Sequence, residues 1–258
     1  MRADFPRDFD RVMRSTQGIQ SERGVIIIPA YNEASNLAGV LREVIACKGD
    51  LDVLVIDDGS RDDTTAIARQ FPCSLLVHPV NLGYAAAVQT GLKCASSRGY
   101  DYSIFLDADG QHNPHDIPRL VATQKRTGAH VVVGSRYLNG KRDRTPLGRW
   151  LGIRFFSSLT TRLTGHRTTD TTSGFKLLTH DAMKAIVEES FGDFHSEALI
   201  YLLLRRYVVV EEPVVARPRV HGNSMYTIWD IWYYPMKTLL AITVVLLKLR
   251  WIWRKGEI

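Results

Sequence analysis

Five short apolar runs alternate with helical patterns between residues 24 and 137, and this alternation constrains the fold more than any other feature. We expect strands at residues 24–28, 52–56, 75–78, 104–106 and 131–133. Apolar residues at helical spacing lie between them, at about residues 37–44, 64–70 and 84–96. Such alternation predicts an α/β fold with a doubly wound, mostly parallel sheet.

Polar side chains follow each expected strand at its carboxyl end. They are Tyr31 and Glu33, Asp57 and Asp58, His78 and Asn81, Asp107 and Asp109, and Ser135 and Arg136. In a parallel sheet these ends lie along one edge, where such folds bind their ligands. We therefore expect one site built from five segments. A Rossmann dinucleotide site and a P-loop are both disfavoured, because the chain has no Gly-x-Gly-x-x-Gly fingerprint and no Walker lysine loop.

Asp107 and Asp109 form an acidic pair after the fourth expected strand. Two carboxylates this close repel each other, and burial increases the cost. A divalent cation between them, or between one of them and a diphosphate, removes the penalty. A polar loop after a strand is the alternative interpretation. An EF-hand loop is not favoured, because Asn113-Pro114 interrupts its series of oxygen ligands.

The chain is basic, with a net charge of +6 and a pI of about 9.3. This balance is typical of proteins that bind a polyanion, a phosphorylated ligand or an anionic membrane. From Arg136 to Arg167 there are eight basic residues and one acidic residue. We interpret this run as an anion site, with a solvated face as the alternative. The three cysteines lack metal or redox spacing and residues 1–24 lack a signal peptide, so we expect a reducing, cytosolic compartment.

The last part of the chain, residues 227–258, has a different composition. Its apolar run of about ten residues is half of the roughly 20 that a helix needs to span a bilayer. Aromatic residues bracket this run, and cations interrupt and follow it; they are Trp229, Trp232, Tyr233, Tyr234, Trp251 and Trp253, with Lys237, Lys248 and Arg250. This pattern predicts a helix lying in a membrane interface, and a core or oligomer-interface helix is the alternative.

Five short motifs occur in order at the expected strand ends. They are Ile28-Pro29-Ala30-Tyr31-Asn32-Glu33, Asp57-Asp58-Gly59-Ser60, Asn81-Leu82-Gly83, Asp107-Ala108-Asp109-Gly110-Gln111 and Gly134-Ser135-Arg136-Tyr137. Together they resemble the family 2 inverting glycosyltransferases of GT-A fold. Residues 170–175, Glu197 and the pattern Arg219-x-x-Gly222-x-Ser224 are similar to the branch that makes dolichyl- or polyprenyl-phosphate mannose or glucose. That branch usually has a lysine where this chain has Met225.

The resemblance implies a domain organisation and a role for each motif. Residues 24–226 would form the GT-A domain, between a flexible segment at 1–23 and the tail at 227–258. Residues that would hold the nucleotide-sugar are Pro29, Tyr31, Glu33, Ile56, Asp58, Asn81, Asp107, Ala108, Asp109 and Arg219. Residues that would bind Mg²⁺ or Mn²⁺ are Asp107, Asp109 and Gln111; those for an acceptor phosphate are Arg136, Arg149 and Arg154. The catalytic set would be Asp109, Arg136, Asp170 and Glu197.

The resemblance implies a metal-dependent enzyme that transfers a sugar from a nucleotide-sugar to a polyprenyl phosphate with inversion. A metal and arginines would stabilise the leaving nucleoside diphosphate. An acceptor phosphate is already a nucleophile and needs only positioning. The alternative is a family 2 enzyme that extends a saccharide, with Asp170 or Glu197 as the general base. A third interpretation is a catalytically inactive protein that only binds nucleotide or membrane. The presence of the acidic pair argues against it.

The expected partners are the nucleotide-sugar, the lipid acceptor and a membrane surface, and not nucleic acid. The expected location is the cytoplasmic face of a membrane, with peripheral or monotopic attachment. The sequence leaves open the sugar, the nucleotide base, the lipid length and whether the chain forms a homo-oligomer.

Overall fold

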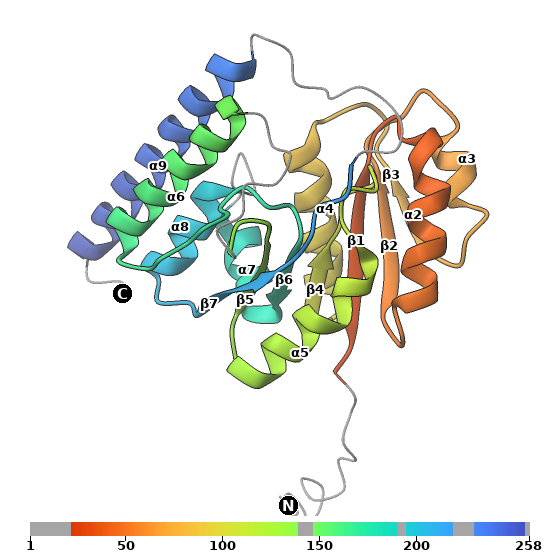
Figure 1. Cartoon of the computed structure of the whole chain (residues 1–258), viewed down its shortest axis with the longest axis horizontal. Helices are drawn as coiled ribbons and strands as arrows, with labels where there is room; N and C mark the ends of the chain where they lie inside the picture. The colour runs from red at the N-terminus through yellow and green to blue at the C-terminus, as the bar shows by residue number, and fades with distance from the viewer. Residues whose placement is uncertain (1–21, 139–146, 190–194, 219–229, 256–258) are drawn as a thin grey trace, which may run out of the picture.

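The computed structural model describes residues 22–138, 147–189, 195–218 and 230–255 of the 258-residue chain. In these ranges a seven-stranded sheet is covered by helices on both faces (Figure 1). The strands are β1 (Gly24–Ala30), β2 (Asp52–Asp57), β3 (Ser74–Val77), β4 (Tyr102–Phe105), β5 (Val131–Ser135), β6 (Lys176–Thr179) and β7 (Val209–Pro213). Their order in the sheet is β3-β2-β1-β4-β6-β5-β7.

Strand β6 is the exception in an otherwise parallel sheet. It runs antiparallel to both neighbours, and Lys176 at its beginning pairs with Phe105 of β4 and Val133 of β5. Because its direction is reversed, β6 begins at the edge where the parallel strands end. The segment 170–175 is thereby brought to the ligand-binding edge that the sequence predicts.

Helices cover the two faces of the sheet in separate groups (Figure 1). Their bounds are α2 (Ala34–Cys47), α3 (Thr64–Ala68), α4 (Tyr84–Ser97), α5 (Ile117–Thr127), α6 (Leu147–Thr164), α7 (His180–Glu189), α8 (Ser196–Leu204) and α9 (Asp230–Lys255), with a 3₁₀ turn η1 at Pro114–Asp116. Residues of α4, α7 and α8 share one apolar cluster with the sheet, whereas α2, α3 and α5 share the other. The fold therefore matches the predicted α/β class.

Strand β1 is covered by helices on both faces, which accounts for its continuous apolar run. Successive side chains point to opposite faces, so Ile27 joins the cluster with α4, and Ile26 and Ile28 join the cluster with α2. All three are fully buried. Complete burial of each such side chain stabilises the fold by about 1.5–3 kcal/mol, which anchors the strand on which Pro29 and Ala30 sit.

Helix α9 is attached to the domain by one of its faces. Ile242, Val245 and Leu249 are buried, and Ile242 clusters with Ile200 of α8 and Phe156 of α6. Helices α6 and α9 run beside each other along one side of the molecule (Figure 1). The inner face of the tail is thus core, as the alternative interpretation proposed. Among the described residues, no helix is both long and apolar enough to cross a membrane.

Several boundaries differ from those predicted. The expected strand at 104–106 is Tyr102–Phe105. The valine-rich runs at 208–210 and 214–216 each predict a closing strand from the sequence, but only one strand forms there, at Val209–Pro213. Beyond β7 the chain continues along the sheet edge, where Val214 N donates to Ser135 O (3.0 Å). Strand β6 and helices α5 and α6 were not predicted.

Candidate active site

The loops after β1 and β2 interlock and fix the start of α2. Asn32 N donates to Ser60 Oγ (2.9 Å), Glu33 N to Thr64 Oγ1 (2.8 Å) and Ala34 N to Asp62 Oδ2 (3.0 Å). The free N–H groups at the helix start are therefore capped by the neighbouring loop. Asn32 and Ser35 are of the residue types that favour N-caps, so the sequence predicts that one of them caps α2. This prediction is wrong, because the N-cap position is Glu33, which makes no side-chain cap bond. Asn32 instead has a φ of 52°.

Residues predicted to hold the nucleotide come together at the ends of β1 and β2. Pro29 lies beside Ile56 in the strand register. The next residues along the chain, Tyr31 and Glu33, are half-buried in the interlocked loop, where Asn36 Nδ2 donates to Glu33 Oε2 (2.6 Å). The structure thus gathers Pro29, Tyr31, Glu33 and Ile56 on one edge of the sheet.

Asp58 is buried and supports the neighbouring loop. Its carboxylate lies 2.7 Å from His78 Nδ1 and accepts from Leu82 N (2.9 Å) and Gly83 N (2.8 Å). These bonds fix the loop that opens α4, in which Asn81 is exposed. Asp58 therefore forms part of the frame of the site, and its contact with a nucleotide stays a prediction.

Asp107 is the first residue of the acidic motif and is held from two sides. Tyr84 Oη donates to its Oδ1 (3.1 Å), and His112 Nε2 lies 3.1 Å from its Oδ2. Burial by itself would raise the pKa of Asp107, but the His112 bond and the nearby charges of His112 and His195 outweigh it, so the pKa lies below the usual range. The carboxylate is therefore ionised, which is the state in which it could bind a cation.

Aromatic rings surround this carboxylate. The Tyr84 ring stacks on His195 with centroids 5.7 Å apart, and His112 stacks on Phe175 at 5.3 Å. Tyr84 and His112 were not predicted as site residues from the sequence. The sequence marks these two residues only by their place next to predicted motifs: Tyr84 directly follows Asn81-Leu82-Gly83, and His112 directly follows Gln111.

The donor set suits a hard divalent cation. Asp107 and Asp109 supply carboxylate oxygens from one loop, and Gln111 N donates to Asp109 Oδ1 (3.0 Å), which fixes the second carboxylate. Within the described ranges, no three His, Cys, Asp or Glu residues are grouped closely enough to hold a metal. The remaining ligands of a cation would therefore come from elsewhere, and diphosphate oxygens are suitable.

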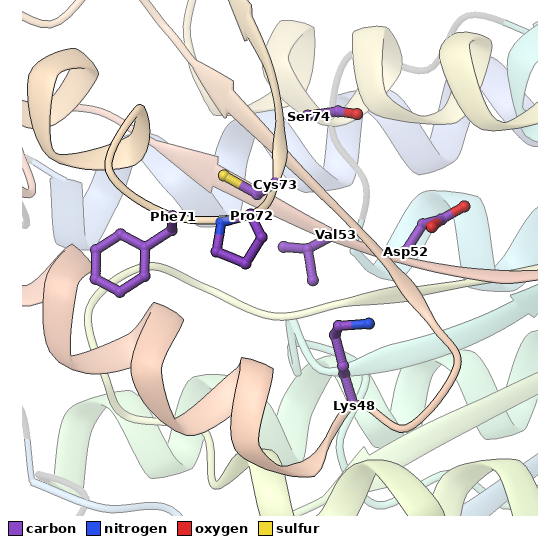
Figure 2. Close-up of a pocket in the computed structure, with 7 residues that line it drawn as sticks. All are labelled: Lys48, Asp52, Val53, Phe71, Pro72, Cys73 and Ser74. Atoms are coloured by element: carbon purple, nitrogen blue, oxygen red, sulfur yellow. The ribbon is translucent and has the colours of Figure 1, made fainter.

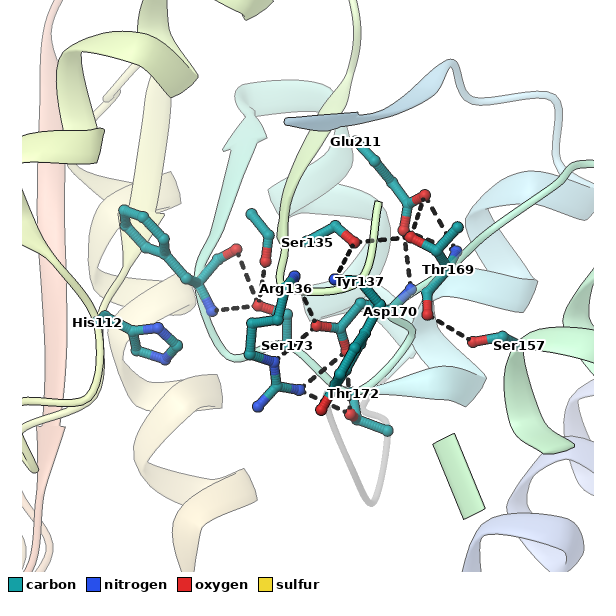
Figure 3. A network of polar contacts seen from close by, with 12 residues as sticks. His112, Ser135, Arg136, Tyr137, Ser157, Thr169, Asp170, Thr172, Ser173 and Glu211 are labelled. Atoms are coloured by element: carbon teal, nitrogen blue, oxygen red, sulfur yellow. Dashed lines mark hydrogen bonds and ion pairs between the residues drawn. The ribbon is translucent and has the colours of Figure 1, made fainter. Parts of the chain in front are cut away.

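Arg136 and Asp170 form a buried ion pair (Figure 3). Arg136 Nε donates to Asp170 Oδ2 (2.7 Å), and Arg136 Nη2 donates to Asp170 Oδ1 (2.9 Å) and to Thr172 Oγ1 (3.1 Å). Burial opposes the charge on both groups, but the mutual bonds and charges lower the pKa of Asp170 and raise that of Arg136. An ionised Asp170 engaged at both oxygens is a poor general base, which argues against that role.

The other predicted site residues lie in different surroundings. Glu197 is fully buried at the start of α8, whereas Arg154 is exposed on α6, with its guanidinium 5.6 Å from the centre of the Trp150 ring. Ala108 is buried beside the acidic pair. Arg219 and the side chain of Arg149 fall outside the described part of the chain.

The structure also has a hollow of about 330 Å³, whose lining is shown in Figure 2. Its lining residues are Lys48, Asp52, Val53, Phe71, Pro72, Cys73 and Ser74. Asp52 and Ser74 begin β2 and β3, so the hollow is at the amino ends of these strands. The acidic motif lies at the opposite edge, and the hollow takes no part in the site.

The fold and the paired carboxylates at the carboxyl edge of the sheet define a nucleotide-sugar transferase of the GT-A class. Residues 25–187 match the family described as glycosyl transferase family 2, and the chain belongs to this family. It is 30% identical over 210 residues to a UDP-N-acetylglucosamine–dolichyl-phosphate N-acetylglucosaminyltransferase of Methanococcus voltae, covering 73% of this chain and 83% of that protein. It is 34% identical to an undecaprenyl-phosphate mannosyltransferase of Micrococcus luteus, covering 78% and 86%.

Solved structures share the fold of this chain. Glucosyl-3-phosphoglycerate synthase from Mycobacterium tuberculosis, crystallised with phosphoglyceric acid, superposes with a TM-score of 0.67 at 16% identity, covering 95% of this chain and 85% of that one. A crystal of the same synthase contains Mn²⁺ and UDP, with a TM-score of 0.63 at 18% identity. The chain is thus a glycosyltransferase of GT-A fold.

Proposed function

We propose that this glycosyltransferase moves a sugar from a nucleotide-sugar to a polyprenyl phosphate at a membrane surface, with inversion. The observation that carries the proposal is the proximity of Arg136 to the acidic motif. Phe105 of β4 and Val133 of β5 both pair with Lys176 of β6, so Asp107 and Arg136 follow neighbouring positions at the same edge of the sheet. Burial opposes the charge of Arg136, but the bonds to Asp170 raise its pKa, and the charge of Asp107 adds a smaller contribution. A cation there suits an anionic acceptor that approaches the donor.

The ion pair with Asp170 orients Arg136 for this role. Asp170 and Thr172 take up Nε and Nη2, and Nη1 takes no part in those bonds. A guanidinium held on one edge presents its remaining N–H groups in a fixed direction, which suits a phosphate. An acceptor phosphate needs no deprotonation, so the poor basicity of Asp170 costs the reaction nothing.

Asp107 and Asp109, with Gln111, are the proposed ligands of Mg²⁺ or Mn²⁺. When bound, the cation would offset the charge that develops on the departing diphosphate. Tyr84 and His112 orient Asp107 through its two oxygens. Such support of a ligating carboxylate is common in metal sites.

The outer faces of α6 and α9 support membrane docking. Exposed large apolar side chains form a stripe along each helix: Leu147, Leu151 and Phe155 on α6, and Met236, Leu240, Val244, Leu247 and Trp251 on α9. Arg154 and Arg250 are exposed on the same two helices. Apolar side chains beside cations fit an anionic bilayer interface. Of the other predicted anchors, Trp229 and the side chains of Trp232 and Trp253 fall outside the described residues.

The alternative acceptor, a saccharide hydroxyl, needs a general base. The ion pair disfavours Asp170 for that task, which leaves Glu197 as the candidate. The polyprenyl phosphate proposal is preferred because it uses Arg136 directly. The names of the Methanococcus and Micrococcus relatives point to the same acceptor class.

The variant Arg136→Ala tests the proposal. Loss of a charged hydrogen bond to a phosphate costs about 1.5–3 kcal/mol, so the KM for polyprenyl phosphate should rise roughly ten- to a hundredfold. The Kd for the nucleoside diphosphate, measured by calorimetry, should change much less. Arg162→Ala, which removes an exposed arginine of the same basic run, is the control. If Arg136→Ala weakens only nucleotide binding, the acceptor assignment is wrong.

A further inference from the structure

Glu211 on β7 accepts hydrogen bonds from one turn of the segment that precedes β6 (Figure 3). Thr169 N donates to both carboxylate oxygens of Glu211 (2.9 and 3.0 Å), and Thr169 Oγ1 donates to Oε2 (2.9 Å). Asp170 N donates to Oε1 (2.9 Å). One carboxylate thus fixes two consecutive backbone N–H groups and a hydroxyl.

The segment held in this way carries the partner of Arg136. Asp170 N binds Glu211, while the Asp170 carboxylate receives Arg136 Nε and Nη2. The Thr169 hydroxyl also meets Ser135 Oγ (2.7 Å), the residue before Arg136. Figure 3 shows these contacts as one connected network between β7 and the end of β5. The orientation of Arg136 therefore depends on a backbone position that Glu211 sets.

We propose that Glu211 is a positioning residue for the acceptor site, acting on Arg136 through Thr169 and Asp170. The inference rests on the proposed function only in assigning Arg136 to the acceptor phosphate. Glu211 itself touches no reacting atom. Without its carboxylate, two N–H groups lose their acceptor, and the turn would move to find others because unpaired N–H groups are costly.

Glu212 provides a matched control. It is the next residue of β7, so its side chain points to the opposite face of the sheet. There it accepts from Arg119 Nη2 (2.7 Å) and Thr123 Oγ1 (2.7 Å) of α5. The same substitution at Glu212 also removes a bonded carboxylate from β7 but leaves the turn at Thr169 untouched.

The first experiment uses NMR to follow the Arg136 Nε–H group in the absence of substrate. In ¹⁵N-arginine protein, the Nε–H signal of Arg136 is assigned by its absence in Arg136→Lys. We expect Glu211→Met to shift this signal and to speed its hydrogen exchange by about tenfold or more, whereas Glu212→Met leaves both unchanged. Glu211→Gln keeps one carbonyl oxygen and should lie between the two, which also covers the case in which Glu211→Met does not fold. An Arg136 signal that is unchanged in every folded Glu211 variant overturns the proposal.

The second experiment measures transfer to undecaprenyl phosphate. Glu211→Gln should raise the KM for the acceptor several-fold with little change in the Kd for the nucleoside diphosphate, and Glu212→Gln should change neither. In an Arg136→Ala background, Glu211→Gln should have no additional effect on KM, because its action passes through Arg136. An equal effect in both backgrounds contradicts the proposal. If the unaltered enzyme does not use this acceptor, the proposed function fails, and the Arg136 signal still decides the role of Glu211.

Discussion

Gly174 leaves just enough space for the carboxylate of Asp107. A Cβ atom at position 174 would lie 2.6 Å from Asp107 Oδ2, closer than such atoms approach in real structures. Gly174 belongs to the segment that β6 brings to the binding edge. The antiparallel strand thus sets the space available to the first acidic residue.

Gly174→Ala should therefore displace Asp107. We expect the Mn²⁺-dependent affinity for a nucleoside diphosphate to fall by about tenfold, since supports of a metal ligand typically have effects of this size. Isothermal titration with and without Mn²⁺ measures it. Gly39→Ala in α2 is the control, because a Cβ there meets nothing within 4 Å, and it should stabilise the helix by about 0.5–1 kcal/mol. Equal Mn²⁺-dependent affinity in both variants would show that the contact is unimportant.

Asp170→Asn should reduce the pH dependence of the free energy of unfolding in the acidic range. The folded-state pKa of Asp170 lies below its ordinary value of 3.8, so the carboxylate stabilises the fold above that pH and loses this effect as the pH falls through the folded-state value. At neutral pH the variant should be destabilised by about 3–5 kcal/mol, because Arg136 loses its buried partner. The difference from the unaltered protein should shrink below pH 3.8.

Urea unfolding followed across this pH range tests the expectation. Asp63→Asn, at an exposed aspartate, is the control. A constant difference at all pH values would mean that Asp170 is not held ionised by Arg136.

The double substitution Leu240→Gln and Leu247→Gln should weaken binding to anionic vesicles. These side chains are 67% and 62% exposed on the outer stripe of α9, so the changes leave the core intact. Burial of each leucine in a bilayer interface contributes up to about 1.5–3 kcal/mol, and we expect binding to fall by at least roughly tenfold. Vesicle flotation measures this. Val80→Gln, at a residue 59% exposed near β3, should bind as before, and unchanged flotation of the double variant would refute docking through α9.

The elements that local pattern determines were predictable from the sequence. Strands β1 and β2 contain continuous apolar runs rich in β-branched residues, and the polar residues after them, such as Asp58, lie where parallel-sheet geometry places them. Strand β6 was missed because Lys176-Leu177-Leu178-Thr179 is short and runs directly into α7. Its pairing depends on β4 and β5, which lie far from it along the chain. Local periodicity carries no information about such distant partners.

The contacts around the acidic motif illustrate the same limit. The spacing of Asp107 and Asp109 predicted a cation site, but nothing local assigned Tyr84 to the first carboxylate or Glu211 to the turn at Thr169. Those contacts join segments that only the folded sheet brings together. The sequence left Asp170 as a candidate general base beside Glu197, and the bonds of Asp170 to Arg136, which argue against that role, could not be predicted from local pattern.

Transfer of a labelled sugar to lipid tests the central claim most directly. Purified protein with Mn²⁺ is supplied with UDP-, GDP- or dTDP-sugars, and with undecaprenyl phosphate, undecaprenol or no acceptor, in anionic vesicles. We predict that one donor gives labelled, acid-labile lipid and released nucleoside diphosphate only with the phosphorylated lipid, and that EDTA or Asp109→Asn abolishes both. Equal transfer to undecaprenol, or transfer to a saccharide with none to undecaprenyl phosphate, would contradict the account.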